Sequence, residues 1–232
     1  MPSDPDPPRP SRVWIARAQP QAEATAARLR ALGFAPVVAP VLTIHPTTDG
    51  AIDLTGVDAL AFTSTAGVAA FAGRVAERGL RVFAVGDATA RAARAEGFGA
   101  VDSAQGDVHA LAERVAAARP RPGLVLNPTA ADPAADLVAL LAARGIAARS
   151  AAVYETREAA PLAAPETFDA VLIHSAKAAR AVARVLAGRD LSQVGAYAIS
   201  AAAAAPLAGL GFQRLAIAPF PNEASLLNLL QG

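Results

Sequence analysis

The chain repeats one long pattern, and this repeat constrains its fold more than any other feature. The segment VFAVGDATARAARAEGF (82–98) aligns without a gap to AYAISAAAAAPLAGLGF (196–212), at an offset of 114 residues. In the same order, LAFTSTAGVAAF (60–71) matches VLIHSAKAARAV (171–182). Because order and spacing hold along the whole chain, we interpret the sequence as two copies of one domain-sized pattern, a duplication and not a solenoid of short repeats.

Each copy alternates short apolar runs with helical windows. We expect strands at 12–17, 36–44, 58–63, 81–85, 99–102, 123–127, 147–156, 169–174, 195–199 and 214–218. We expect helices at 20–32, 65–78, 87–96, 107–118, 133–144, 176–187, 201–210 and 223–231, with Asp107 and Asn222 as equivalent N-caps. Strict alternation predicts parallel sheets with helices on both faces, and continuous apolar strands suit such buried sheets. The predicted fold class is therefore α/β.

Composition excludes several classes of function. The 232 residues are 53% hydrophobic and 18% charged, so a sizeable core is expected. A formal net charge of +1 favours neither a nucleic-acid partner nor a membrane surface. The sequence has no cysteine, which excludes disulfides, thiolate nucleophiles and cysteine-bound zinc and suits a reducing compartment such as the cytoplasm.

Two segments need separate interpretation. The first eleven residues are proline-rich without an apolar core, so we expect a disordered tail and not a signal peptide. The segment 191–213 carries no charge and is long enough to span a bilayer. We expect a soluble strand and helix instead, because the segment contains glycines, a proline and many alanines. Its counterpart in the first copy also carries charged residues.

No familiar catalytic signature is present. The motifs GxxxxGK[ST], GxGxxG and GxSxG do not occur, and His45, His109 and His174 lack the spacing of a metal site. Hydroxyl side chains instead recur in the turns from strand to helix, at 63–65, 86–89, 174–175 and 200. Such turns lie at the carboxyl edge of a parallel sheet, where helix N-termini bind anions, although serine and threonine also act there as ordinary N-caps.

From end to end, apart from the proline-rich tail, the chain resembles the uroporphyrinogen-III synthase family. The matching segments, in chain order, are ARAQPQAEATAARLRALGF, DALAFTSTAGVAAF, VFAVGDATARAARAEGF, VYET, DAVLIHSAKAARAV and PNEASLLNLL. The resemblance implies two flavodoxin-like lobes joined by a two-stranded linker, with the active site in the cleft between them. One lobe would comprise 1–39 with 157–232 and the other 45–150, with linker strands at 39–45 and 151–157.

The resemblance also implies a reaction. The linear tetrapyrrole hydroxymethylbilane would cyclise with loss of water and inversion of ring D through a spiro intermediate, without metal or organic cofactor. Tyr154 matches the tyrosine expected to assist departure of the hydroxyl, although it can equally be a strand-forming residue. Residues expected to bind the substrate are Arg17, Thr63, Ser64, Thr89, Ser175, Lys177 and Ser200. No feature requires more than a monomer.

The sequence departs from the family pattern at two places. Ala203 stands in the second copy where the first has Thr89, and Asn127 and Thr129 stand where an arginine is often found. Two alternatives remain open: a cytoplasmic two-lobed protein that binds a small acid without chemistry, and an inactive relative of the synthase. Turnover distinguishes both alternatives from the enzyme.

Overall fold

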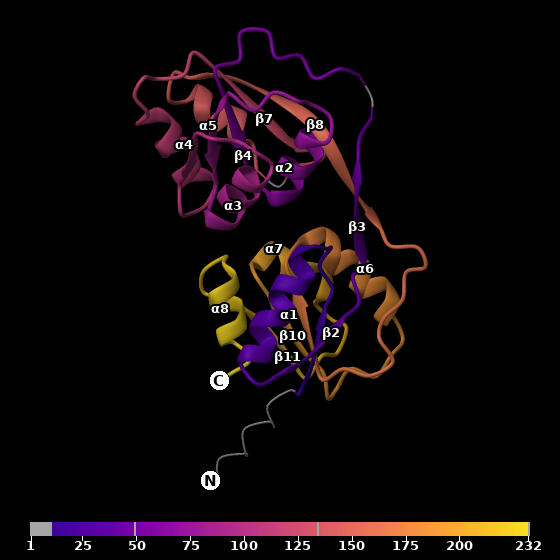
Figure 1. The fold of residues 1–232 in the computed structure, drawn as a ribbon. Helices are drawn as coiled ribbons and strands as arrows, with labels where there is room; N and C mark the ends of the chain where they lie inside the picture. Colours follow the sequence, from indigo (N-terminus) through magenta and orange to yellow (C-terminus); the bar gives the residue numbers. More distant parts are fainter. Residues whose placement is uncertain (1–10, 49, 134, 232) are drawn as a thin grey trace. The chain divides into compact units, whose positions relative to one another are not determined.

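The computed structural model describes residues 11–48, 50–133 and 135–231. The expected disordered tail lies outside these residues except for Ser11. The chain divides into two compact units, Met1–Thr43 with Arg157–Gly232 (unit 1) and Ile44–Thr156 (unit 2) (Figure 1).

Within the described residues, unit 1 is built on a five-stranded parallel sheet. The strands lie in the order β11-β10-β9-β1-β2, which is the flavodoxin-like order when they are numbered along this unit. The strands are β1 (Arg12–Ile15), β2 (Ala35–Val38), β9 (Ala170–Ile173), β10 (Gly195–Ala198) and β11 (Arg214–Ile217). The helices are α1 (Gln21–Ala31), α6 (Ala176–Leu186), α7 (Ala201–Ala204), the 3-10 turn η1 (Ala205–Leu207) and α8 (Glu223–Asn228).

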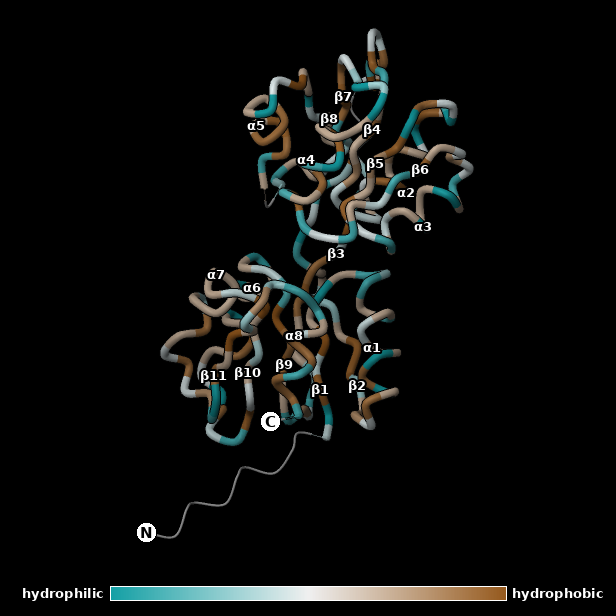
Figure 2. Tube along the Cα trace, turned by 90° about the vertical axis from the view of Figure 1, so that its left-hand side faces the viewer, coloured by the Kyte–Doolittle hydropathy of each residue, from teal (hydrophilic) through white to brown (hydrophobic). Residues whose placement is uncertain are grey.

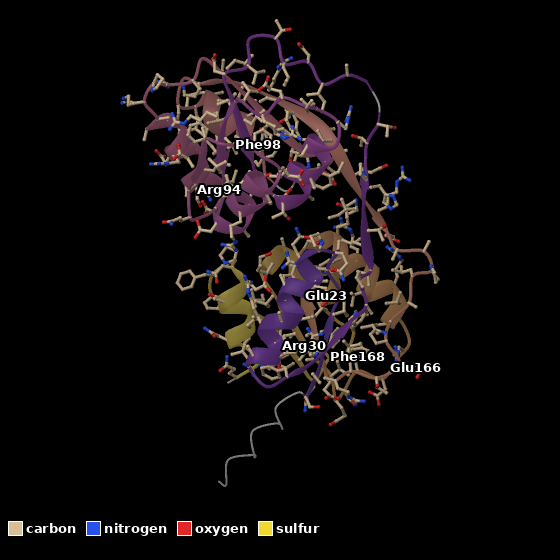
Figure 3. All side chains as sticks on the ribbon, viewed as in Figure 1. Glu23, Arg30, Arg94, Phe98, Glu166 and Phe168 are labelled. Atoms are coloured by element: carbon tan, nitrogen blue, oxygen red, sulfur yellow. The ribbon has the colours of Figure 1, made fainter. Side chains whose placement is uncertain are left out.

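Alternate residues of these strands form two separate cores. Val13 and Ile15 face α1 and α8, whereas Trp14 faces the side covered by α6 and α7. The hydrophobic colour along β1 and β9 in Figure 2 reflects strands that are buried on both faces. Phe168, labelled in Figure 3, packs edge-on against Trp14 with ring centroids 5.0 Å apart. Unit 1 is therefore a three-layer α/β/α unit.

Unit 2 repeats this layered construction. Its parallel strands are β4 (Ala59–Phe62), β5 (Arg81–Ala84), β6 (Val101–Ser103), β7 (Leu124–Ala130) and β8 (Ala147–Glu158). Its helices are α2 (Thr65–Ala72), α3 (Asp87–Ala95), α4 (Val108–Ala116) and α5 (Leu137–Ala142). One core joins α2 and α3 to the sheet around Phe62, Phe71 and Phe98, the last labelled in Figure 3. The other core joins α4 and α5 to the opposite face.

Two strands cross the boundary between the units. They are β3 (Leu42–Pro46) and β8, which are neighbours at the edge of the second sheet, so this sheet has six strands among the described residues. Thr47 N–H donates to the carbonyl of Val153 at 2.9 Å, and Ala159 N–H donates to the carbonyl of Val41 at 2.9 Å. Because residue numbers fall along one strand as they rise along the other, the pair is antiparallel.

The predicted α/β class and parallel sheets are confirmed, and both sheets share one spatial order, with β8-β7-β4-β5-β6 matching β2-β1-β9-β10-β11. This shared order supports the duplication, which stays a proposal. Asp107 and Asn222 are confirmed as N-caps, since their side chains accept from backbone N–H groups of α4 and α8. No described helix is long and apolar enough to cross a membrane, and the segment 191–213 forms β10, α7 and η1, as expected.

Several predicted boundaries are wrong, and proline explains two of them. The single strand expected at 36–44 is two strands, because Pro40 has no N–H for a ladder, and β3 instead pairs with β8. The helix expected at 201–210 ends at Ala204 and continues only as a 3-10 turn containing Pro206. The helices expected at 65–78 and 133–144 are also shorter, spanning only α2 and α5.

The N-terminal turn of α2 touches the backbone of β7 at Gly67. A Cβ atom at this position would lie 2.8 Å from the Pro128 carbonyl oxygen. We therefore expect Gly67→Ala to lower the free energy of unfolding by about 1–3 kcal/mol, because a side chain must push the helix off the strand. Gly73→Ala, at the right-handed C-cap of the same helix, should stabilise by about 0.5 kcal/mol. Urea unfolding measures both, and equal effects would contradict the contact.

Candidate active site

Each sheet has one pair of neighbouring strands whose connections lead to opposite sides of the sheet. Such a place is called a topological switch point. In unit 1 this switch point lies between β1 and β9, and in unit 2 between β7 and β4. Ligands of open α/β sheets bind outside the carboxyl ends of the strands at such points. Arg17 follows β1 at the register level of His174, which follows β9, whereas Thr63 and Ser64 follow β4. These side chains therefore occupy the two switch points.

Arg17 is held by an acidic residue of α8. Its Nη1 atom donates to Glu223 Oε2 at 2.8 Å and to Thr25 Oγ1 at 3.4 Å. Glu223 also accepts from the Thr25 hydroxyl at 2.5 Å and forms an ion pair with Arg28 at 3.3 Å. Burial lowers the pKa of the Arg17 guanidinium, an effect that Glu223 opposes. Because only Nη1 is engaged within the described residues, Arg17 keeps further donors for a ligand.

His174 lies beside Arg17 as a neutral imidazole. Both of its ring nitrogens are buried and have no hydrogen-bond partner in the part of the chain that the structure describes. Burial, with a smaller contribution from the positive charge of Arg17, lowers the pKa of His174 from 6.5 to about 3. Protonation would place two positive charges together, so the imidazole stays uncharged at neutral pH.

Three predicted serines cap helices at the carboxyl edges. The hydroxyl oxygens of Ser64, Ser175 and Ser200 accept from backbone N–H groups in the first turns of α2, α6 and α7 at 3.0–3.3 Å. The capping alternative is therefore confirmed for all three residues. Each hydroxyl retains its own hydrogen as a donor, so capping does not prevent ligand binding. Lys177 lies in the first turn of α6, next to one of these caps.

Ser64 also contacts Tyr154. Its hydroxyl oxygen lies 3.1 Å from the phenol oxygen of Tyr154, and either atom can donate. The phenol comes from β8, where the register with β7 shifts between Thr129, which pairs with Ala152, and Ala130, which pairs with Tyr154. A bulge of this kind redirects the following side chain, and here it leaves Tyr154 at the rim of the core around Phe62.

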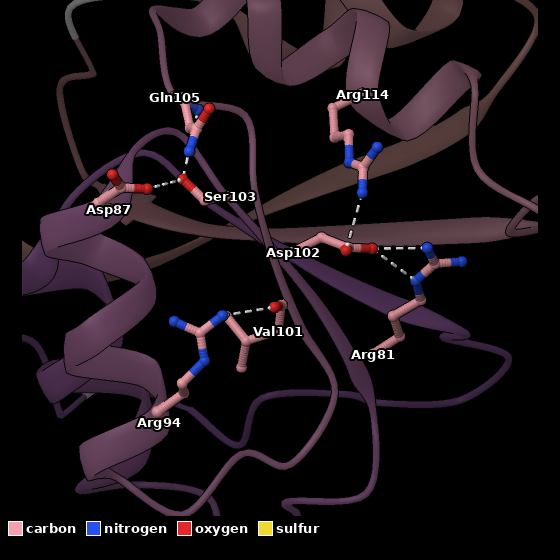
Figure 4. A network of polar contacts seen from close by, with 8 residues as sticks. All are labelled: Arg81, Asp87, Arg94, Val101, Asp102, Ser103, Gln105 and Arg114. Atoms are coloured by element: carbon pink, nitrogen blue, oxygen red, sulfur yellow. Dashed lines mark hydrogen bonds and ion pairs between the residues drawn. The ribbon is translucent and has the colours of Figure 1, made fainter.

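Thr89 lies in a different environment from the serines. Its side chain is only 5% exposed, and Asp87 occupies the first turn of the same helix, α3. Asp87 accepts from the Ser103 hydroxyl at 2.7 Å, beside a second group in which Asp102 binds Arg81 and Arg114 (Figure 4). The first turns of α2, α6 and α7 carry no acidic residue. The first turns of α2 and α6 therefore suit a carboxylate better than that of α3 does, whereas α7 has only four residues.

The structure also shows what Asn127, one of the departures from the family pattern, does. Asn127 is buried and its amide donates to the Ala61 carbonyl at 2.7 Å, so it ties β7 to β4 at the switch point and does not replace an exposed arginine. Sequence reasoning missed Glu223 as the partner of Arg17, because only the fold brings α8 beside α1. It placed His174 at a strand end but gave no sign of its burial. Among the described residues, no group of three or more His, Cys, Asp or Glu side chains could hold a metal ion.

Fold and site together define the class of protein: two doubly wound α/β units with anion-suited helix N-termini at both switch points. A family model described as uroporphyrinogen-III synthase HemD matches residues 23–228. The chain therefore belongs to the uroporphyrinogen-III synthase family, the cyclising lyases of tetrapyrrole biosynthesis.

Solved structures are similar over nearly the whole chain. Uroporphyrinogen-III synthetase from Helicobacter pylori matches with a TM-score of 0.64 and 19% identity, covering 95% of this chain and 98% of that one. A mutant uroporphyrinogen III synthase from Thermus thermophilus matches with a TM-score of 0.49 and 18% identity, covering 95% and 97%. At these identities the Helicobacter match supports the fold alone. No curated protein sequence matches the chain significantly.

The burial of the His174 imidazole leads us to expect a pH-dependent stability. The pKa of His174 is about 3 in the folded chain and 6.5 in the unfolded chain, so only the unfolded chain binds this proton between those values. Stability contributed by the neutral form is therefore complete above pH 6.5 and is lost as the pH falls towards 3. We expect His174→Leu and His174→Asn to remove this dependence, gaining about 2 kcal/mol relative to wild type between pH 8 and pH 5.

Denaturant unfolding of the three proteins at several pH values measures the effect. Parallel pH profiles for wild type and both variants would contradict a buried, neutral His174.

Proposed function

We propose that this chain is an active uroporphyrinogen-III synthase that converts hydroxymethylbilane into uroporphyrinogen III. The observation that carries the proposal is the pair of serine-capped N-termini of α2 and α6, which have no acidic residue in their first turns and lie at the carboxyl edges of the two sheets. Membership of the family supports the activity. An inactive relative or a binding protein would have the same fold, so turnover decides between them.

The chemistry of the substrate suits such a site. Hydroxymethylbilane carries eight carboxylates, and hydroxyls and backbone N–H groups at helix N-termini can hold carboxylates without a strongly basic surface. The net charge of +1 agrees with this kind of binding. We propose Ser175 and Ser200 as hydroxyl donors, the first turn of α2 behind Ser64 as a source of backbone N–H donors, and Arg17 as the charged contact. Thr63, Thr89 and Lys177 are further proposed contacts.

The proposed reaction needs orientation more than strong acid or base. The bond from the terminal methylene to the hydroxyl oxygen breaks, the oxygen keeps the electron pair, and a proton from the Tyr154 phenol completes a water molecule. The substituted carbon of ring D then attacks the azafulvene methylene and forms the spiro intermediate. After rearrangement, the substrate loses a proton as its last ring regains aromaticity. This proton returns to the phenolate. Holding the two ends of the linear substrate in position for this attack supplies most of the rate enhancement.

We also propose the organisation of the working enzyme. Residues 1–39 with 157–232 and residues 45–150 would act as its two lobes, with linker strands at 39–45 and 151–157. We propose that the chain works as a monomer, since both switch points lie within the described residues. The substrate class is a small polycarboxylate, and we expect the enzyme to work in the cytoplasm.

The isomer of the product tests the function. We expect the purified chain, given freshly generated hydroxymethylbilane, to yield mainly the type III isomer, because the spontaneous reaction closes without inversion to type I. Oxidation of the products followed by chromatographic separation measures the ratio. Type I product formed at the uncatalysed rate would overturn the proposed activity, and binding without turnover would favour the binding-protein alternative.

Arg17 should affect binding and not the chemical step. We expect Arg17→Ala to raise KM about ten- to hundredfold with little change in kcat, because a hydrogen bond between charged groups contributes about 1.5–3 kcal/mol. Arg30→Ala is the matched control, since it removes an exposed arginine of α1 (Figure 3) and should leave KM unchanged. Steady-state kinetics measure both variants. A loss confined to kcat would contradict the assignment of Arg17.

A further inference from the structure

Ser64 differs from the other serine N-caps because its hydroxyl has a second, specific partner. The oxygen accepts from Gly67 N–H at 3.0 Å and lies 3.1 Å from the phenol oxygen of Tyr154. The corresponding hydroxyls of Ser175 and Ser200 have only their backbone partners in the part of the chain described. Capping alone therefore does not account for the arrangement at Ser64.

The direction of the hydrogen bond between Ser64 and Tyr154 decides what the phenol can do. If Tyr154 donates to Ser64, its proton is already used. If Ser64 donates, the Tyr154 hydrogen remains available for a leaving hydroxyl. Gly67 N–H, Ser64 O–H and Tyr154 O–H then form a chain of donors that begins at the positive end of α2.

The local structure holds this pair at a fixed separation. Ser64 follows β4 and Tyr154 lies on β8, with only β7 between these two strands in the sheet. Gly67 lies so close to the Pro128 carbonyl of β7 that a Cβ atom would not fit, which fixes the first turn of α2 against the sheet. The bulge in β8 then sets the direction of the phenol.

We propose that Ser64 is the positioning residue of Tyr154: it donates a hydrogen bond to the phenol oxygen, keeps the phenol proton available for the leaving hydroxyl, and stabilises the phenolate that remains. The inference rests on the proposed synthase function. It assigns Ser64 to the chemical step in place of substrate binding, because the single hydrogen of its hydroxyl is donated to the phenol. As the carbon–oxygen bond breaks, the phenol proton joins the departing oxygen to form water, and the Ser64 hydroxyl and the end of α2 offset the charge left on Tyr154.

The test separates the hydroxyl from its capping role. Ser64→Ala removes both the hydroxyl and the cap, Ser64→Gly removes the hydroxyl but costs the helix only a few tenths of a kcal/mol, and Ser64→Thr keeps both. We expect kcat to fall about tenfold in the Ala and Gly variants, with KM within about twofold, and to stay near wild type in the Thr variant. Thermal denaturation of each variant checks that the fold is intact.

A double-mutant cycle with Tyr154→Phe shows whether Ser64 acts through the phenol. We expect Ser64→Gly to cause no further loss of kcat once Tyr154 is Phe, because the two residues act as a unit. Asp107→Ala, which removes the N-cap of α4 in the same unit, is the control and should leave kcat unchanged in both backgrounds.

Each outcome has a distinct meaning. The positioning role would be overturned, while the synthase function stands, if Ser64→Gly kept the wild-type kcat. It would also be overturned if Ser64→Gly lowered kcat by the same factor in wild type and in Tyr154→Phe. Full activity of Tyr154→Phe would overturn it as well, by removing the phenol from the reaction. Failure of the wild-type chain to form type III product would overturn the function and the inference together.

Discussion

All strands of a parallel sheet end at the same edge, and the direction in which the chain then winds decides which strand ends stay accessible to a ligand. In both units of this protein, one strand of the switch point is followed by a turn with polar side chains. These turns are His174-Ser175 after β9 and Thr63-Ser64 after β4. In unit 1, β1, the other strand of the switch point, is followed by Arg17. In unit 2, β8, which is separated from β4 by β7 alone, adds Tyr154.

The chemistry of the site depends on groups that have little charge. Serine caps satisfy the first turns of their helices and still keep a hydroxyl hydrogen, so one side chain can stabilise the fold and offer a donor. The charged contact in unit 1 is held on one side by Glu223, and the imidazole beside it is kept neutral by burial. We propose that each of these carboxyl edges can hold a carboxylate of the substrate without a strongly basic surface.

The sequence predicted the architecture well because strand and helix formation here follow local rules. Apolar runs, hydroxyl caps and the repeat determined the class and the position of nearly every element. Two predictions failed where a proline interrupted a pattern, at Pro40 in a strand and at Pro206 in a helix, since hydrophobic periodicity does not register a missing N–H donor. They also missed contacts made only by folding: Glu223 reaches Arg17 across 206 residues, and Tyr154 reaches Ser64 across 90.

We propose that the carboxyl edge of each sheet binds substrate carboxylates at its switch point. A crystal structure of the chain with bound uroporphyrinogen III, or with a stable polycarboxylate analogue, tests this most directly. We expect ligand carboxylates within hydrogen-bond distance of the first turns of α2 and α6 and of Arg17, with a pyrrole ring near the Tyr154 phenol. A ligand bound at the amino edges of the sheets, or on the outer faces of the helices, would contradict this proposal.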